Sequence, residues 1–291
     1  MIRFENTEVM GWESAIRGMR NPMNSWEKSD SGLCEDFQCG FLDGISGYLS
    51  DTRPIYPLKN ANECGLTGEY IIGPNDLDLM RRLASGGPVH AKYRRMITVY
   101  VDITAPLYWW KEFDTYKVGT VANSCSTMHK IADKEFTLED FSHERMIHAA
   151  RIDLGHTIDA LNFFRRLYLH GGMAKDEDGN LCGYGEKSKE IWWQMIQLLP
   201  SSYNQKRTVM LNYEVLAHIW NDRRNHKLDE WSEHEAPMND VTTSEDLVKG
   251  DIQQHLVPGV KEYFGFCDWI KTLPYSELIT GGNENAGKCE N

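Results

Sequence analysis

The spacing of apolar residues predicts helices in several parts of the chain. Residues 8–20 place an apolar side chain at every third or fourth position, which is the period of a short amphipathic helix. Asn75 can cap a second helix, which is expected to end at a Gly-Gly-Pro run. The longest apolar stripe covers residues 146–170, and a further helix is predicted over 188–198.

Between Ile97 and Ile103 every second residue is apolar and the residues between them are polar. This alternation predicts a strand with one buried face, closed by Ala105-Pro106. A third long helix is predicted from about residue 205 to residue 227, where apolar positions continue at helical spacing.

Two stretches lack a sustained period. Residues 28–74 are rich in Gly, Asp, Asn and Ser, and residues 232–258 are polar, so both are expected to be irregular. An amphipathic segment follows at 259–272, and no internal repeat is found. A single domain over residues 1–291 that contains both irregular segments is therefore expected.

The composition is that of a folded globular protein, with 41% apolar, 11% aromatic and 25% charged residues among 291. The N-terminal run MIRFENTEVMGWE has neither the basic start nor the apolar core of a signal peptide. The apolar stretches fall short of the roughly 20 residues that a bilayer helix needs. Seven cysteines without a CxxC pair fit reduced thiols. We therefore expect a cytoplasmic protein that does not cross a membrane.

The charge and the absent motifs narrow the ligand classes. A net charge of -12 repels nucleic acid polymers at long range, but it allows a local cationic pocket to hold one small phosphate. Cys34 and Cys39 have no matching second pair, so no metal site is expected. The sequence contains no GxGxxG, no Walker loop and no HExxH. Mononucleotides remain candidate ligands.

The predicted helix at 205–227 carries the most informative polar side chains. A helical wheel places Asn212, Arg223 and His226 on one face together with Leu216 and Ile219. A buried arginine needs a carboxylate or a phosphate as its partner. Two readings stay open: Arg223 pairs with an acid of the protein such as Glu112 or Asp114, or it binds an anionic ligand.

Residues 107–130 gather aromatic, cationic, amide and hydroxyl side chains without a clean period, which suggests the lining of a site. The alternative is a helix end and loop whose Ser, Thr and Asn side chains make local turns and caps. Cys125 lies near His129 in sequence and is a candidate nucleophile. A single cysteine is more often a small buried apolar residue.

Two separated segments resemble the flavin-dependent thymidylate synthases. The first is the strand that ends in Ala105-Pro106, followed after ten residues by the position of that family's Arg-His-Arg signature. The second begins at Leu199-Pro200, reaches Asn212 after twelve residues and Arg223 after eleven more. The run HKLDEW at 226–231 also resembles the family's sequence after its nucleotide-binding arginine.

The chain departs from the family pattern at defined positions. Thr115-Tyr116-Lys117 stands where the family has Arg-His-Arg, Glu112 replaces a glutamine, and Ile196 replaces an arginine. After Lys117 two alignments stay open. One matches Asn123, Cys125 and Thr127 to the family's Glu, Ser and Arg, and the other matches Asn123 and Ser126 to its Asn and Ser.

The resemblance implies an α+β fold, with helices packed on a small, mostly antiparallel sheet, assembled into a homotetramer. It also implies FAD as cofactor, and transfer of a one-carbon unit from methylenetetrahydrofolate to C5 of deoxyuridine monophosphate (dUMP), with NADPH reducing the flavin. The implied cofactor-binding residues are Thr115, Tyr116, Lys117, Asn212 and His218. The implied substrate-binding residues are Arg223, Glu112, Lys117, Asn123 and Ser126, and the candidate catalytic residues are Arg223, Ser126 and Cys125.

Two alternatives keep the same fold. One is hydroxymethylation of a pyrimidine nucleotide, because the altered residues need not retain the family's product. The other is a non-catalytic nucleotide-binding relative that has lost flavin, which would account for the missing arginine and histidine.

Overall fold

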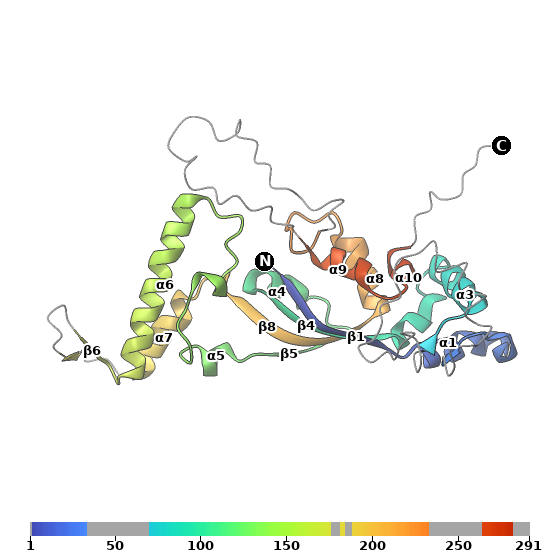
Figure 1. Ribbon diagram of the computed structural model, residues 1–291, viewed down its shortest axis with the longest axis horizontal. Coiled ribbons are helices and arrows are strands. Elements are labelled where there is room, and N and C mark those ends of the chain that lie inside the picture. The colour runs from blue at the N-terminus through green and yellow to red at the C-terminus, as the bar shows by residue number, and fades with distance from the viewer. Residues whose placement is uncertain (1, 34–69, 176–180, 184–187, 233–263, 282–291) are drawn as a thin grey trace, which may run out of the picture.

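The computed structural model describes residues 2–33, 70–175, 181–183, 188–232 and 264–281 (Figure 1). In chain order the strands are β1 (Arg3–Met10), β2 (Gly32–Leu33), β3 (Tyr70–Ile71), β4 (Thr98–Pro106), β5 (Val121–Ser124), β6 (Met173–Lys175), β7 (Leu181–Gly183) and β8 (Asn204–Asn212). The α-helices are α1 (Trp12–Arg20), α3 (Pro74–Ser85), α4 (Leu107–Phe113), α5 (Thr127–Lys130), α6 (His148–Leu169), α7 (Ser188–Leu198), α8 (Tyr213–Arg223), α9 (Phe266–Thr272) and α10 (Glu277–Thr280). The 3-10 helices are η1 (Asn21–Met23), η2 (Trp26–Lys28), η3 (Ala91–Met96) and η4 (Leu138–Asp140).

A four-stranded antiparallel sheet in the order β1-β4-β8-β5 forms the centre of the molecule (Figure 1). The predicted strand at 97–103 is confirmed as β4, which pairs with β8 along its whole length from Thr98↔Asn212 to Pro106↔Asn204. Alternate residues of β4 are buried, because a strand turns successive side chains to opposite faces. The mixed fold class, with helices on a small antiparallel sheet, is confirmed.

The main hydrophobic core lies between this sheet and the helices α4, α8 and α9. Its centre is aromatic: the ring of Trp109 lies 4.5 Å from Trp231 and 5.1 Å from Phe113, measured between ring centroids. Trp109, Trp231 and Phe266 are fully buried. Burial of such large rings stabilises the packing of α4 and α9 against the sheet.

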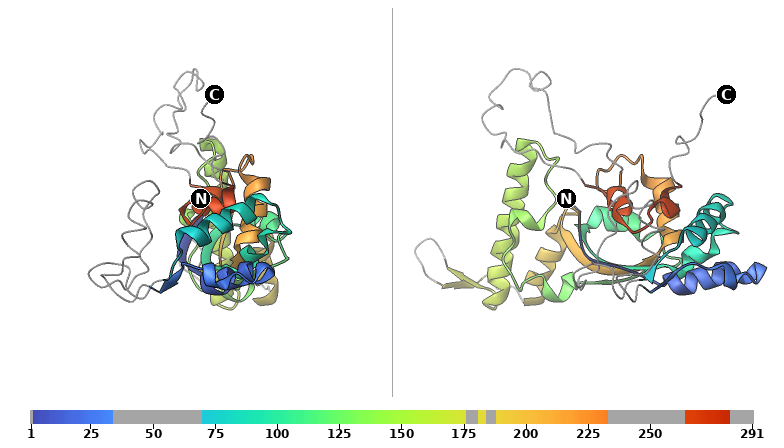
Figure 2. Two further views of the ribbon diagram at one scale, coloured as in Figure 1. Left: turned by 90° about the vertical axis from the view of Figure 1, so that its right-hand side faces the viewer. Right: turned by 45° about the vertical axis from the view of Figure 1, so that its right-hand side comes forward.

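A second, separate core lies at the other end of the molecule, around α6 and α7 (Figures 1 and 2). Leu154, Ile158 and Leu161 of α6 are buried there together with Met195 of α7. The predicted helices at 146–170 and 188–198 are thus confirmed, with bounds within two residues. No helix within the described ranges combines the length and apolarity needed to traverse a lipid bilayer.

The prediction of one helix over 205–227 is wrong in its first part. Residues up to Asn212 form strand β8, and the helix begins only at Tyr213. The strand forms because β4 and β5 pair with it from both sides, which overrides local helical spacing. Asn212 is the N-cap of α8, and its Oδ1 accepts hydrogen bonds from the backbone of Glu214 and Val215, both at 3.1 Å.

Three further predictions change in detail. Residues up to Met10 form a strand, so the helix predicted at 8–20 begins at Trp12, after Gly11 with φ +96°. Gly73, not Asn75, is the N-cap of α3. Of the segment predicted at 259–272, helix α9 covers Phe266–Thr272. Residues 34–69 and 233–263, which hold most of both irregular stretches, lie outside the described residues.

A buried ion pair connects α1 with α3. Arg20 Nε donates to Asp76 Oδ1 at 2.6 Å, and both side chains are almost completely buried. The other carboxylate oxygen of Asp76 accepts from the hydroxyls of Ser29 and Ser31 and from the backbone N–H of Asp30. Four described groups therefore donate to this buried carboxylate, and the network fixes residues 29–31 against α3.

Candidate functional site

Two polar side chains of helix α4, one turn apart, contact the end of α8 and the segment that follows it. Trp109, Trp110 and Phe113 face the core, so Tyr108 and Glu112 lie on the other side of the helix. Tyr108 donates a short hydrogen bond to Glu230, and Glu112 accepts from Arg223. The segment from Arg223 to Glu230 therefore runs along α4.

Arg223 lies at the centre of a polar cluster with Glu112, Tyr116 and His226. Its Nη1 donates to Glu112 Oε2 at 2.7 Å, and its Nε donates to Tyr116 Oη at 2.9 Å. The guanidinium carbon also lies 5.0 Å from the ring centroid of Trp231. The protein partner that the sequence analysis left open is thus Glu112. Asp114 pairs instead with Arg207, at 2.7 Å.

His226 joins Arg223 to the turn that follows it. Its Nδ1 lies 3.2 Å from the backbone N of Leu228, and its Nε2 lies 2.9 Å from Arg223 Nη1. A neutral imidazole has a single acceptor nitrogen, so it accepts from one of these two donors. Nε2 also lies 3.5 Å from Glu112 Oε2.

The three residues at the Arg-His-Arg position have different environments. The Thr115 hydroxyl donates to the backbone oxygen of Glu112 at 2.7 Å, so it closes the end of α4. Tyr116 Oη donates to Asp222 at 3.2 Å in addition to accepting from Arg223. Burial raises the pKa of Tyr116, although the Arg223 guanidinium opposes that shift, so the hydroxyl stays protonated at neutral pH. Lys117 is exposed.

The candidates Asn123, Cys125 and Ser126 lie along the edge of the sheet and are all exposed. Asn123 belongs to β5 and pairs with Thr208 of β8, and the Cys125 backbone N–H donates to the backbone oxygen of Lys206. Ser126 is the N-cap of α5, because its hydroxyl accepts from the His129 backbone N–H at 3.3 Å. The alternative that Cys125 is a buried apolar residue is wrong, since the free thiol is exposed.

Asn212, which the helical wheel placed on one helix face with Arg223, is the N-cap that precedes α8 and not part of the helix. Asn212 ends β8 beside the 117–120 loop, where a Cβ on Gly119 would lie only 2.9 Å from Asn212 Nδ2. Gly119 also has φ +80°, so this loop requires glycine. His218 is 60% exposed and lies 3.5 Å from the buried Glu214. Ile196, at the family's arginine position, packs against the second core.

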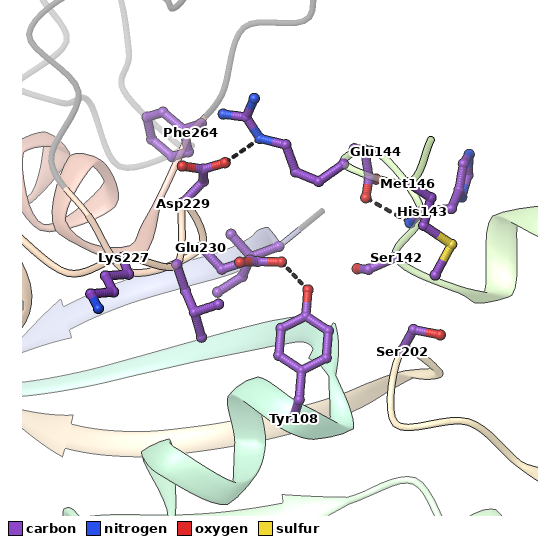
Figure 3. A pocket seen from close by; sticks show the side chains of 13 residues that line it. Tyr108, Ser142, His143, Glu144, Met146, Ser202, Lys227, Asp229, Glu230 and Phe264 are labelled. Atoms are coloured by element: carbon purple, nitrogen blue, oxygen red, sulfur yellow. Dashed lines mark hydrogen bonds and ion pairs between the residues drawn. The ribbon is translucent and has the colours of Figure 1, made fainter. Parts of the chain in front are cut away.

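A cavity of about 590 Å³ opens beside the 227–230 segment (Figure 3). Tyr108, His143 and Ser202 line it, and the Tyr108–Glu230 and Arg145–Asp229 contacts close parts of its wall. Burial and the Glu230 carboxylate raise the pKa of Tyr108 far above its ordinary value. The wall also carries Glu144, Asp229 and Glu230 against Arg145 and Lys227, a balance that disfavours an anionic phosphate.

Sequence reasoning missed this cavity and the network around Arg207. Arg207 of β8 stacks on Trp110 at 4.1 Å from the ring centroid, and its Nε donates to Gln205 at 3.0 Å. Gln205 in turn donates to the Cys125 backbone oxygen and to Thr127 Oγ1. The alternation of β8 could have placed Gln205 and Arg207 on one face of a strand. Within the described parts of the chain, no three His, Cys, Asp or Glu side chains group closely enough to hold a metal ion.

Comparison with known proteins gives a similarity of structure without one of sequence. No protein-family model matches the chain, and no curated protein matches it. Thymidylate synthase X (ThyX) from Helicobacter pylori with FAD and dUMP is similar over 97% of this chain and 98% of its own, at 11% identity and a TM-score of 0.49. A second structure, the flavin-dependent thymidylate synthase ThyX from the same organism complexed with FAD and dUMP, covers 96% and 98%, at 12% identity and a TM-score of 0.48. These values assign no ligand to this chain.

Proposed function

We propose that the chain is a flavin-dependent thymidylate synthase-like enzyme that transfers a one-carbon unit from methylenetetrahydrofolate to C5 of a pyrimidine nucleotide such as dUMP. One observation carries the proposal. The two segments that resemble this family, far apart in sequence, contact each other: β5 pairs with β8, and Arg223 bonds to Glu112 and Tyr116. A set of residues that acts on one ligand has to meet in this way.

Arg223 is suited to bind the nucleotide because its position is fixed while part of its guanidinium stays free. Nε and Nη1 are held by Tyr116 and Glu112. No described residue bonds to Nη2, and the side chain keeps 18% of its surface exposed. A fixed guanidinium presents its remaining donors to a phosphate or a pyrimidine carbonyl without a further ordering cost. Lys117, Asn123 and Ser126 are exposed on the adjoining loop and edge strand and would complete the substrate site.

The residues near the 117–120 loop fit FAD through their free donors. The Asn212 Nδ2 group and the Lys117 ammonium have no hydrogen-bond or ion-pair partner among the described residues, and the buried Thr120 hydroxyl has none either. Donors and one cation of this kind fit the polar groups and phosphates of a dinucleotide. Tyr116 and His218 are the further cofactor-binding residues of this proposal. When bound, reduced flavin would supply hydride, and NADPH would restore it.

FAD binding is the first test. The purified chain is expected to bind FAD, seen as flavin absorbance after purification or after titration. Lys117→Ala should weaken that binding because it removes the one cation of the 115–117 triplet, whereas Lys111→Ala, an exposed lysine on α4, should not. Absence of bound FAD even at high concentration would remove the synthase proposal.

A specific observation favours a second candidate, a nucleotide-binding relative without flavin. The hydroxyls of Thr115 and Tyr116 are already used within the protein, by the Glu112 backbone and by Arg223 with Asp222. Of the three positions that carry Arg-His-Arg in the family, the first two, Thr115 and Tyr116, therefore offer no free donor. Nucleotide binding in calorimetry, combined with no FAD binding, would identify this candidate.

A homotetramer is expected in solution, with sites shared between subunits. The edge strand β5 supports this expectation, because its four side chains are exposed and one of its edges has no partner strand in the described chain. Light scattering at micromolar concentration measures the assembly. Mixing an Arg223→Ala protein with a Lys117→Ala protein should restore part of the activity if each site draws on two chains. A stable and active monomer would contradict both expectations.

A further inference from the structure

The cavity beside the 227–230 segment is lined by a carboxylate that has no counter-charge within the described chain. Glu230 Oε1 accepts from the Tyr108 hydroxyl (Figure 3). The other oxygen, Oε2, bonds to no described residue, and no described cation forms an ion pair with it. A half-buried carboxylate loses part of its hydration, which is costly unless a positive charge compensates. A ligand that supplies this charge would be stabilised here.

The arginine and the lysine of the cavity wall do not balance Glu230. Arg145 Nε donates instead to Asp229, at 2.6 Å. Lys227 is exposed, and Figure 3 shows its side chain directed away from the Tyr108–Glu230 pair. The negative charge of Glu230 is therefore left for a ligand in the cavity.

The position of the Glu230 carboxylate is fixed from two sides. The backbone oxygen of Glu230 accepts from the Phe266 N–H at 2.8 Å, and its side chain is held by Tyr108. Tyr108 keeps its proton at neutral pH, because burial and the Glu230 carboxylate raise its pKa. A carboxylate fixed in this way binds a donor with little further ordering cost.

The remaining wall and the size of the cavity define the rest of the ligand. Four apolar side chains line the cavity, namely Ile2, Met146, Leu228 and Phe264. Its volume of about 590 Å³ lies in the usual range of small-molecule sites. An ionised carboxylate only accepts hydrogen bonds, so the ligand has to donate. A neutral donor would satisfy Oε2 but would leave the charge of Glu230 uncompensated.

We propose that this cavity binds a small organic ammonium ion. An N–H of the ammonium group donates to Glu230 Oε2, and the hydrocarbon part of the ligand contacts the apolar residues of the wall. The site shares no residue with the Arg223 cluster, so the proposal does not rest on the nucleotide function above.

The test compares benzylamine, which is an ammonium ion at neutral pH, with benzyl alcohol. Both probes donate a hydrogen bond and carry the same ring, so the ratio of their affinities isolates the positive charge. Calorimetry on the full chain should give about tenfold tighter binding of benzylamine, the usual gain from one charged hydrogen bond. This comparison uses the wild-type chain and is therefore independent of any effect of a variant on folding.

Glu230→Gln removes the charge but keeps the shape of the side chain and an acceptor for Tyr108. It should abolish most of the preference for benzylamine. Glu139→Gln, which changes an exposed carboxylate outside the cavity wall, should leave the preference unchanged. Equal binding of the two probes by the wild type, no binding of either, or a preference that persists in Glu230→Gln would each overturn the proposal.

Discussion

Replacing Arg223 with alanine is expected to weaken binding of the pyrimidine nucleotide by about 2–5 kcal/mol, the usual cost of removing one partner of a desolvated charged contact. The expected loss in affinity is about thirtyfold to several thousandfold. Two effects contribute. The variant removes the free Nη2 donor, and it leaves Glu112 without the cation that holds it at 2.7 Å. Calorimetric titration with dUMP measures the loss.

The neighbouring Arg224 provides a matched control. It is exposed at the end of α8, so Arg224→Ala removes the same charge from nearly the same place without touching the cluster. Its effect on affinity should stay within the small range of a surface charge. If Arg223→Ala lowers the melting temperature but leaves nucleotide affinity unchanged, Arg223 forms a structural ion pair and nothing more.

Replacing Asp76 with alanine is expected to lower the free energy of unfolding by about 3–5 kcal/mol, because it leaves a buried arginine without its counter-charge. The Asp76 side chain is 0% exposed and Arg20 is 4% exposed. Among the residues that the structure describes, Arg20 would keep only its bond to the Ser25 backbone oxygen, at 3.2 Å. Urea unfolding should show a lower midpoint with an unchanged slope.

Asp78 on the same helix is the control, since it pairs with Arg82 on the surface, where both side chains are more than half exposed. Asp78→Ala should cost no more than about 1 kcal/mol. A similar loss for both variants would show that the helix, and not the buried pair, is affected.

The buried carboxylate of Asp76 should also make the free energy of unfolding depend on pH. Burial raises the pKa of Asp76, but hydrogen bonds from Ser31, Ser29 and Arg20 outweigh it, so the native pKa is lowered. A lowered native pKa means that the unfolded chain binds the proton first. The stabilisation is therefore complete above about pH 4, near the ordinary aspartate pKa, and is lost as pH falls below it. The Asp76→Ala variant should show a smaller loss in that range.

The elements that sequence predicted well are those in which one period continues without interruption. The alternation from Ile97 to Ile103 is that of a strand with one face on a core, and β4 extends it to Pro106. The stripe at 146–170 is long enough to define a helix by itself, and α6 covers residues 148–169 of it. Neither prediction required knowledge of a distant partner.

The prediction of a single helix over residues 205–227 was wrong for a different reason. Val209 and Leu211 follow a period of two and Leu216 and Ile219 follow a helical period, so one helical wheel drawn over both mixes two registers. The change occurs at Asn212, whose side chain caps the helix. An asparagine followed by Tyr-Glu at the start of an apolar stretch is an N-cap signal, and this signal would have divided the segment correctly.

For the candidate site, the sequence indicated one partner of Arg223 but not the others. A partly buried arginine requires an acid, and Glu112 was one of two acids named for Arg223. The contact of Tyr116 with both Arg223 and Asp222 depends on how the end of α4 packs beside α8, which no local pattern encodes. The cavity near Tyr108 is likewise lined by segments 142–146 and 227–230 together with Ser202, which meet only in the fold.

The two hydrophobic cores also affect how this sequence can change over time. Among the described residues, no buried side chain belongs to both the cluster at the sheet and the cluster around α6 and α7. Substitutions that alter the size or shape of one interior therefore need no compensating substitution in the other. Residues of α6 and α7 can diverge while Glu112 and Arg223 keep their geometry, so selection can act on the two halves of the molecule separately.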